Sequence, residues 1–580
     1  MKKLITGNEA VARGAYESGV TFASGYPGTP STEILEEIAK YKGVQAEWSA
    51  NEKVALDKII GVSLSGRRSM AVMKHVGVNV ASDTLMTLSY TGVNAGLVLV
   101  VVDDPGMYSS QNEQDSRIYA KFAKIPLLEP SDSQEAKDFV LLAFKISERY
   151  DTPVMIRLTA RIAHTESVVE IKDNVNRRSY YKKFKHDPCK YVMVPANARK
   201  RRIFVEERLT KLEEFSRHIL YNRIEWGSSN IAFVASGIVY QYAKEAFPEA
   251  SFLKLGMTFP IPVSLVKSFT KKFKVFYIAE ELDPFLEEQI KSAQITHGIG
   301  KKLFPYTGEL NQDYISRALK RQVKKNSVNK YTKIDNSRSL LCCGCPYLGV
   351  FYLLKKMKII AIGDIGCYAL NVFSSYNSLA TCISMGSSLG IASGLGRFAQ
   401  KGLKRKVVSV IGDSTFFHSG LSALADIVYN KGAQKILILD NKAAAMTGGQ
   451  GHPGTGQRLK GEKGRKIEFE PLIKAMGINR VFTVNSYNLK AIKEVLGREI
   501  VNEGISVVII DSPCLLVSKA RVVTKYRVLS NFCRNCKECL KLGCSALLID
   551  NDQRVTIDNN ACTGCSFCYQ ICPAKAIRPI

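Results

Sequence analysis

The sequence predicts an α/β protein made of several parallel-sheet domains and one small cysteine-rich domain at its C-terminal end. With 580 residues, of which 46% are hydrophobic, the chain is too long for a single core and has ample apolar material for several. Short β-rich stretches alternate with helical ones, as βαβ units require. Eight of the 15 cysteines lie within residues 533–572, a spacing too tight for a disulfide framework.

Charge and hydropathy limit the classes of protein that the chain can represent. Lys and Arg number 81 against 53 Asp and Glu, a net charge of +28, which favours acidic partners or a solvated basic surface. No apolar run approaches the roughly 20 residues of a membrane span, and the first residues lack a signal core. We therefore expect a cytoplasmic protein without a membrane partner, in a compartment that keeps cysteines reduced.

The first α/β domain is expected over residues 1–170. Its strands and helices are expected to alternate, with strands at 69–73 and 96–103 and helices at 32–41 and 52–64. These four elements fit a parallel sheet with helices between its strands.

A basic segment, residues 171–225, follows. Its first part, 171–202, holds eleven Lys or Arg against two Asp, with Tyr180, Tyr181 and Phe184 among them. Single-strand nucleic-acid binders also place aromatic residues between cations. No recognition module surrounds the segment, so we interpret it as a linker or docking arm and expect no nucleic-acid partner.

The rest of the chain divides into four parts. A smaller α/β domain is expected at 226–305, a turn-rich linker at 306–340, a third α/β domain at 341–520 and the cysteine-rich domain at 521–580. The strands expected in the two α/β domains are 230–236, 275–281, 358–363, 407–412, 435–440 and 506–511.

Two cysteine quartets carry the strongest motif. The second has the spacing C-x2-C-x2-C-x3-C-P of two-cluster ferredoxins, and the first has one extra residue before its last cysteine. In such runs the fourth cysteine binds the other cluster, so we expect two [4Fe–4S] clusters rather than zinc, whose ligands come in two pairs. The ligand sets are Cys533, Cys536, Cys539 and Cys572 for one cluster, and Cys562, Cys565, Cys568 and Cys544 for the other.

Polar residues follow two expected strands of the third domain. Gly412, Asp413 and Ser414 come after one strand, and Asn441 and Ala443 after the next. Carboxyl ends of parallel strands share one edge of a sheet, where ligands bind. A carboxylate, an amide and a backbone carbonyl suit Mg²⁺ bound to a diphosphate, whereas a lone Gly-Asp pair is usually a turn.

This pattern resembles the thiamine-diphosphate motif, with Ser414 in place of its second glycine. Further segments resemble the α subunit of indolepyruvate ferredoxin oxidoreductase, within the 2-oxoacid:ferredoxin oxidoreductases. They span nearly the whole chain: 25–33 (GYPGTPSTE), 47–53 (EWSANEK), 73–77 (MKHVG), 104–106 (DPG), 111–114 (QNEQ), 364–368 (DIGCY) and 452–456 (HPGTG).

The resemblance implies thiamine-diphosphate-binding-type parallel-sheet domains and a two-cluster ferredoxin-like domain. Residues 1–170 would hold the pyrimidine, 226–305 would be a transketolase C-terminal-like domain, and 341–520 would hold diphosphate and Mg²⁺. Glu52 would be the carboxylate beside the pyrimidine, Thr29 would contact the substrate carbonyl, Arg117 would bind the substrate carboxylate, and His75 would line the site unless it is a structural histidine.

A third, proximal [4Fe–4S] cluster is also implied, because related enzymes have cluster ligands at the positions of Cys342, Cys345, Cys367 and Cys514. The family's C-P-G-C-P-H string is altered here by Cys343 and Tyr347. Structural C-x2-C pairs are the alternative for these residues.

The implied activity is the oxidative decarboxylation of aryl pyruvates, chiefly indolepyruvate, with coenzyme A to aryl-acetyl-CoA and CO₂, with ferredoxin as electron acceptor. The alternatives are another 2-oxoacid, such as pyruvate or phenylpyruvate, or an electron-transfer subunit of a different complex. A smaller β subunit would supply the missing γ-type domain in an α₂β₂ assembly.

Overall fold

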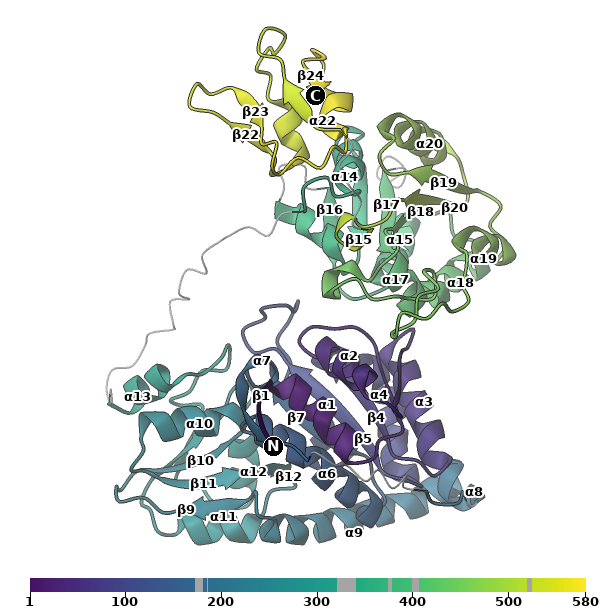
Figure 1. Ribbon diagram of the computed structural model, residues 1–580. Helices are drawn as coiled ribbons and strands as arrows, with labels where there is room; N and C mark the ends of the chain where they lie inside the picture. The colour runs from purple at the N-terminus through teal and green to yellow at the C-terminus, as the bar shows by residue number, and fades with distance from the viewer. Residues whose placement is uncertain (173–180, 185, 321–340, 374–377, 399–405, 519–523) are drawn as a thin grey trace. The chain divides into compact units, whose positions relative to one another are not determined.

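The computed structural model describes residues 1–172, 181–184, 186–320, 341–373, 378–398, 406–518 and 524–580. The chain forms two compact units, residues 1–327 and 328–580, which are described separately (Figure 1). Tyr180 and residues 321–340, most of the expected linker, lie outside the described residues. Within the described part of the chain, no helix has both the length and the apolar character needed to cross a membrane.

A seven-stranded sheet forms the centre of the first unit. Its order is β12-β6-β7-β5-β4-β2-β3, and only β12 runs antiparallel to its neighbour β6. Every residue of β4 and β5 is buried, because helices cover both faces. The strands are β2 (Phe22–Gly25), β3 (Gln45–Trp48), β4 (Ser69–Lys74), β5 (Leu97–Asp103), β6 (Leu127–Leu128), β7 (Val154–Thr159) and β12 (Met257–Phe259).

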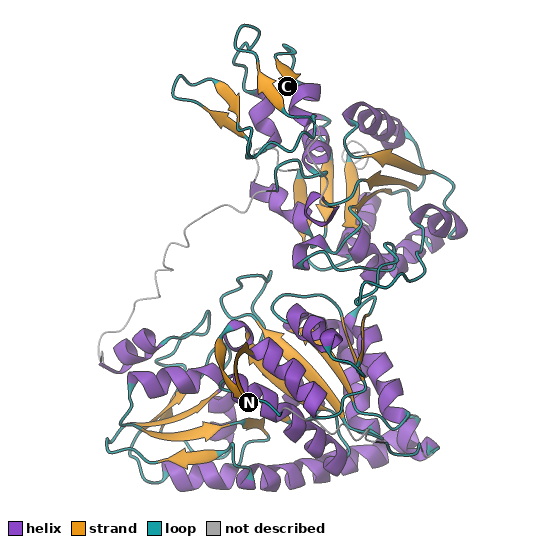
Figure 2. Cartoon of the chain, in the orientation of Figure 1, coloured by secondary structure: helices purple, strands orange, loops and turns teal. Residues whose placement is uncertain are grey.

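Helices α1, α2 and α6 pack together, as do α3 and α4 (Figure 2). Helices α2 and α3 and strands β4 and β5 confirm the four elements expected in this region to within one residue. The helices are α1 (Gly7–Glu17), α2 (Thr32–Lys40), α3 (Glu52–Leu64), α4 (His75–Thr91) and α6 (Ser133–Tyr150).

The described part of the basic segment is mostly helical and packs on this domain. It forms α8 (Pro188–Tyr191) and the long α9 (Pro195–His218). Arg208 of α9 is buried and donates hydrogen bonds to the carbonyls of Asp151 (2.8 Å) and Ser89 (2.9 Å), and Lys190 pairs with the Asp151 carboxylate at 2.8 Å. Arg208 and Lys190 therefore hold the segment in place, a function that charge counting alone could not reveal.

A five-stranded sheet of order β14-β13-β10-β11-β9 lies in the same unit. Strand β12, which follows β11 in the sequence, joins the seven-stranded sheet instead. One hydrophobic core contains residues of both sheets. The strands are β9 (Arg223–Glu225), β10 (Ala232–Ser236), β11 (Ser251–Leu255), β13 (Phe276–Ala279) and β14 (Gly298–Ile299), with α10 (Gly237–Ala246) and α12 (Phe285–Ser292) between them.

The second unit contains a fully parallel six-stranded sheet of order β16-β15-β17-β18-β20-β19. Three expected strands match β17, β18 and β20 residue for residue, while β15 begins two residues late, after Lys358 adopts φ +56°. The strands are β15 (Ile360–Gly363), β16 (Leu379–Cys382), β17 (Val407–Gly412), β18 (Lys435–Asp440), β19 (Val481–Asn485) and β20 (Ser506–Asp511).

The cysteine-rich residues complete the second unit with two small antiparallel sheets, β21-β24 and β22-β23. Phe567, Leu547 and Val555 of this part share a hydrophobic core with Phe351 and Leu489 of the larger sheet region. The elements are β21 (Tyr526–Val528), β22 (Leu547–Ile549), β23 (Val555–Ile557), α22 (Phe567–Ile571) and β24 (Ile577–Pro579).

Candidate active site and cysteine groups

Asp413 lies at the carboxyl edge of the six-stranded sheet, directly after β17, and its side chain is 4% exposed. The Ser414 N–H donates to Oδ1 at 2.8 Å and the Ala443 N–H donates to Oδ2 at 3.2 Å. His452 Nε2 also donates to Oδ2 at 3.0 Å, while the Gly454 N–H donates to its Nδ1. This pattern fixes the histidine tautomer and holds the carboxylate in one orientation.

Asn441, which follows β18, converges on Asp413 and Ala443 as the sequence predicts. One terminal atom of its amide lies 2.8 Å from the Ala443 carbonyl oxygen and 3.3 Å from Asp413 Oδ2, and the other lies 3.0 Å from the Tyr347 hydroxyl. Hydrogen bonding alone requires the NH₂ group to face the two oxygens. With the amide oxygen facing them, the site presents three oxygen ligands of the kind that Mg²⁺ takes.

A second layer of charges surrounds this oxygen cluster. Burial and the neighbouring Asp413 raise the pKa of Asp440 to about 6. Lys442 pairs with Asp440 and, at 2.7 Å, with Asp511, which ties β18 to β20 beside the site. The residues that the sequence predicts for a cation and a diphosphate therefore fit that role chemically.

In the first unit, Glu52 is the first residue of α3 and is 6% exposed. Asn51 caps the helix by accepting the Val54 N–H at 2.9 Å. A Cβ at Gly77 would lie 2.7 Å from Cγ and Oε1 of Glu52, so the carboxylate rests on the first turn of α4. Only glycine permits this close approach.

His75 begins α4 and is 1% exposed, and neither of its ring nitrogens has a hydrogen-bond partner among the residues that the structure describes. Burial lowers its pKa. The adjacent Lys74 donates from Nζ to the Ser109 carbonyl at 2.7 Å, and Ser109 Oγ donates to the Thr29 carbonyl at 3.1 Å. Three predicted residues, Thr29, Glu52 and His75, thus lie on neighbouring segments at the carboxyl edge of the first sheet.

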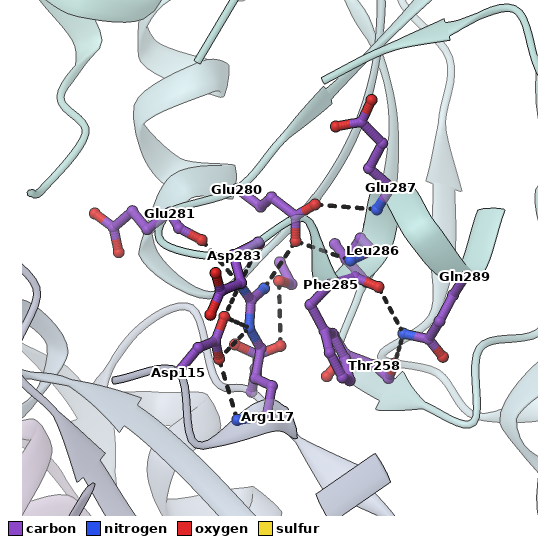
Figure 3. A network of polar contacts seen from close by, with 12 residues as sticks. Asp115, Arg117, Thr258, Glu280, Glu281, Asp283, Phe285, Leu286, Glu287 and Gln289 are labelled. Atoms are coloured by element: carbon purple, nitrogen blue, oxygen red, sulfur yellow. Dashed lines mark hydrogen bonds and ion pairs between the residues drawn. The ribbon is translucent and has the colours of Figure 1, made fainter. Parts of the chain in front are cut away.

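Arg117, the predicted contact of the substrate carboxylate, is buried among partners of the protein itself. Its guanidinium is 1% exposed and lies in a polar network between the two sheets of the first unit (Figure 3). Nε donates to Asp115 Oδ1 at 2.8 Å, Nη1 to Glu280 Oε2 at 3.0 Å, and Nη2 to the carbonyls of Glu281 (2.8 Å) and Asp283 (3.2 Å).

Burial by itself would lower the pKa of Arg117, but Asp115, Glu129 and Glu280 raise it well above its usual value. Asp115 already occupies the guanidinium face that a substrate carboxylate would need. These contacts join α5 (Arg117–Ala123) to the connection between β13 and α12, and the substrate-binding role of Arg117 stays a prediction.

The twelve cysteines predicted as cluster ligands gather in three groups, all in the second unit. Cys536 is exposed, and a cavity beside it is lined by all four cysteines predicted for one cluster, together with Arg534 and Lys537. These cysteines are Cys533, Cys536, Cys539 and Cys572.

The other predicted sets also lie together. Burial and the neighbouring thiols Cys565, Cys544 and Cys562 raise the pKa of Cys568 to about 12. Burial and the nearby Cys514 and Cys342 raise the pKa of Cys367 to about 11. Within the described residues, no three His, Cys, Asp or Glu side chains converge closely enough for a single ion.

The proximal cysteine group adjoins the oxygen cluster around Asp413. The Cys514 N–H donates to the Asn441 carbonyl at 2.8 Å. Tyr347, two residues after Cys345, reaches Asn441 and is fully buried, which raises its pKa. Sequence reasoning noticed Tyr347 only as a departure from a motif and assigned no role to His452, although His452 stands in one of the matching strings.

Three family models match the chain. "Pyruvate flavodoxin/ferredoxin oxidoreductase, thiamine diP-bdg" matches residues 13–214, "Thiamine pyrophosphate enzyme, C-terminal TPP binding domain" matches 364–510, and "4Fe-4S binding domain" matches 555–578.

Curated relatives match the chain over its full length. Indolepyruvate oxidoreductase subunit IorA of Methanothermobacter thermautotrophicus is 40% identical, and that of Archaeoglobus fulgidus is 36% identical; each match covers 100% of this chain and 97% of the relative. A solved 2-oxoglutarate:ferredoxin oxidoreductase from Magnetococcus marinus aligns with a TM-score of 0.45 at 16% identity, over 55% of this chain and 65% of that chain.

Proposed function

Since the chain belongs to the indolepyruvate oxidoreductase IorA family of 2-oxoacid:ferredoxin oxidoreductases, we propose that it oxidatively decarboxylates aryl pyruvates, chiefly indolepyruvate. Coenzyme A would accept the acyl group, and ferredoxin would accept the electrons. The chain is an oxidoreductase subunit that uses thiamine diphosphate and an iron–sulfur cluster.

The observation that carries the proposal is the convergence of Asp413, Asn441 and Ala443 beside a cysteine group in one compact unit. A bare electron carrier has no need of the oxygen cluster. A thiamine decarboxylase that transfers no electrons has no need of twelve grouped cysteines.

The oxygen cluster is the proposed site of Mg²⁺ and the diphosphate, with Gly412 and Ser414 beside it. Oδ2 of Asp413, the Asn441 amide oxygen and the Ala443 carbonyl would be the Mg²⁺ ligands. When bound, thiamine diphosphate supplies the nucleophilic carbon and the electron sink that decarboxylation needs.

Glu52 is the proposed proton carrier of the first unit. Its buried carboxylate would accept a hydrogen bond from the pyrimidine and exchange a proton with it. Thr29 and His75 would line the substrate side, where the His75 ring, kept neutral by burial, can both donate and accept a hydrogen bond.

The three cysteine groups are the proposed ligands of three [4Fe–4S] clusters, which accept electrons one at a time. Residues 521–580 hold nine Lys or Arg against four Asp or Glu, and this surplus would attract an acidic ferredoxin. A smaller β subunit in an α₂β₂ complex completes the proposed assembly.

The test is an anaerobic assay of the chain with its partner subunit on indolepyruvate, phenylpyruvate, pyruvate and 2-oxoglutarate. We expect CoA-dependent reduction of ferredoxin to be fastest with an aryl pyruvate. Activity on pyruvate alone would overturn the aryl assignment, and no activity on any 2-oxoacid, with the clusters intact, would favour the electron-transfer alternative.

A further inference from the structure

Lys74 is a buried cation at the carboxyl edge of the first sheet, at the end of β4 and directly before His75. It is 7% exposed and forms no ion pair with any residue that the structure describes. Among those residues, its Nζ has one hydrogen-bond acceptor, the Ser109 carbonyl at 2.7 Å. An ammonium group has three donors, so two are left for a ligand. A buried charge without a counter-ion is costly, and a bound anion would remove that cost.

The carboxylate of Asp104, on the loop after β5, compensates the charge of Lys74 only in part. Its Oδ2 accepts hydrogen bonds from the Ser109 N–H (2.8 Å), the Ser109 hydroxyl (3.1 Å) and the Ser110 hydroxyl (2.5 Å). Burial lowers the pKa of Lys74 to about 8, although Asp104 acts in the opposite direction. Lys74 therefore remains mostly protonated at pH 7 and still lacks a direct counter-ion.

The side chain of Lys74 runs beside the segment that carries Thr29. A Cβ at Gly28 would lie 3.3 Å from Cβ and 3.7 Å from Cδ of Lys74. Ser109, which accepts the hydrogen bond from Nζ, is exposed and donates its hydroxyl to the Thr29 carbonyl at 3.1 Å. The ammonium group thus lies two hydrogen bonds from Thr29, on the side of the sheet edge where the chain is open to a ligand.

We propose that the ammonium group of Lys74 binds the carboxylate of the 2-oxoacid, which makes Lys74 a further substrate-binding residue of the first unit. The inference rests on the proposed function, because the ligand is the substrate of that reaction. Every 2-oxoacid has its carboxylate bonded directly to the carbonyl carbon, so one site must hold the two groups side by side. Thr29, the predicted contact of the carbonyl, and Lys74 are placed to do this.

The other cation considered for this role has less to offer a ligand. The guanidinium of Arg117 already holds Asp115 in a forked contact and donates to Glu280 as well. Lys74 has no such partner and presents a compact charge with donors to spare.

The chemistry of the substrate predicts which kinetic constant depends on Lys74. The carboxylate leaves as CO₂, so its negative charge is lost from that group while the bonding electron pair stays on the substrate carbon. An ion pair with Lys74 therefore stabilises the bound substrate more than the transition state. Removing the ammonium group should raise KM more than it lowers kcat.

The experiment uses two probes that differ only at the carboxyl group, indolepropionate and its neutral amide, indolepropionamide. Calorimetry would measure their binding to the complete complex with thiamine diphosphate, so this readout does not depend on turnover. Lys74→Met removes the charge, and Lys74→Gln removes it but retains a donor for the Ser109 carbonyl. Lys267→Met, at an exposed position of α11 (Val263–Thr270), controls for the loss of one positive charge.

We expect both neutral variants to bind indolepropionate at least about tenfold more weakly, because a hydrogen bond between two charged groups is lost. Their affinity for the amide and their thiamine diphosphate content should not change, and Lys267→Met should behave like the unaltered complex. KM for the fastest 2-oxoacid should rise with the same factor as the loss of carboxylate binding.

Three results would overturn the inference. An unchanged affinity for indolepropionate would exclude the contact, and equal weakening of both probes would mean that Lys74 only holds the loop of Ser109. Loss of thiamine diphosphate would assign the charge to the cofactor instead. If the unaltered complex prefers the carboxylate probe through Lys74 but turns over no 2-oxoacid, only the proposed function fails.

Lys74→Arg decides the question if neither neutral variant folds. Arginine keeps a positive charge at this position, so the preference for indolepropionate over the amide should persist. A folded Lys74→Arg complex that binds the two probes equally would contradict the inference.

Discussion

The carboxyl edges of the two large parallel sheets differ in how their polar atoms are satisfied. In the second unit, Asp413 accepts hydrogen bonds from three groups and is locked in place. In the described part of the first unit, both ring nitrogens of His75 and one oxygen each of Asp103 and Asp104 are buried and find no hydrogen-bond partner. Buried polar atoms without partners are rare in native proteins and usually mark missing water or ligand.

This difference separates two tasks. A rigid, satisfied oxygen cluster suits the tight binding of a cation and a diphosphate, which do not change during the reaction. Polar atoms that lack internal partners suit contacts with a substrate that arrives and leaves. We therefore expect substitutions at the Asp413 edge to abolish cofactor binding and those at the Glu52 edge to impair chemistry while binding persists.

The largest effect is expected for Asp413→Ala. Removing the carboxylate takes away one proposed Mg²⁺ ligand and leaves His452 without its partner, so bound thiamine diphosphate and activity should both fall by at least about 100-fold. Cofactor content after gel filtration and 2-oxoacid turnover measure the two losses. Asp426→Ala, on an exposed face of α18 (Leu421–Tyr429), is the control. Full cofactor content in Asp413→Ala would contradict the assignment.

Glu52→Gln should distinguish most clearly the catalytic role of the Glu52 edge from the cofactor-binding role of the Asp413 edge. The amide keeps the size and burial of the side chain but cannot exchange the proton, so turnover should drop about 10²- to 10⁴-fold while thiamine diphosphate stays bound. Glu288→Gln, in the first turn of α12 and 58% exposed, should leave turnover unchanged. If Glu52→Gln decarboxylates normally, the carboxylate has no catalytic role.

Arg117→Lys tests the buried network of Figure 3. Lysine cannot make the forked contacts to Asp115, Glu280 and the two carbonyls, so the free energy of unfolding should fall by about 3–5 kcal/mol, as when other buried ion pairs are broken. Urea unfolding measures this loss, and Arg217→Lys on the exposed face of α9 is the control.

The KM for the 2-oxoacid distinguishes the two roles considered for Arg117. It should stay the same in the folded Arg117→Lys protein, because the guanidinium already holds a protein carboxylate. A raised KM with unchanged stability would support the substrate-binding role.

The sequence predicts the second unit's site better than the first unit's. Asp413 and Asn441 follow strands whose buried, β-branched runs are unmistakable, and the topology of a parallel sheet then brings them together. The two C-terminal cysteine groups also follow from local spacing, whereas the proximal group follows only from the family resemblance. His452 and Tyr347 reach the same site from loops, and no periodicity signals their position.

Arg117 illustrates why long-range contacts escape such reasoning. Its partners Glu280 and Glu281 lie more than 160 residues away, in a different sheet region. A single sequence carries no signal that pairs them, and the role predicted for Arg117 came from the family resemblance alone. Arg208 of α9 is likewise paired with backbone carbonyls far away in sequence, which charge counting does not reveal.

The smallest predicted effect concerns the acidic side of the Arg117 network. Burial raises the pKa of Glu281 to about 7, so the folded protein favours the neutral carboxyl group. The contribution of this group to the free energy of unfolding is therefore lost as pH rises from about 4.5 through 7. Glu281→Gln cannot ionise and should be more stable than the unaltered protein at pH 8, by about 1 kcal/mol or more, with no advantage at pH 5. Urea midpoints across this range, with the exposed Glu245→Gln as control, measure the effect. If the difference in stability between the two proteins does not change with pH, Glu281 is ionised in the folded protein at every pH tested. The network around Arg117 would then carry one more negative charge than burial favours.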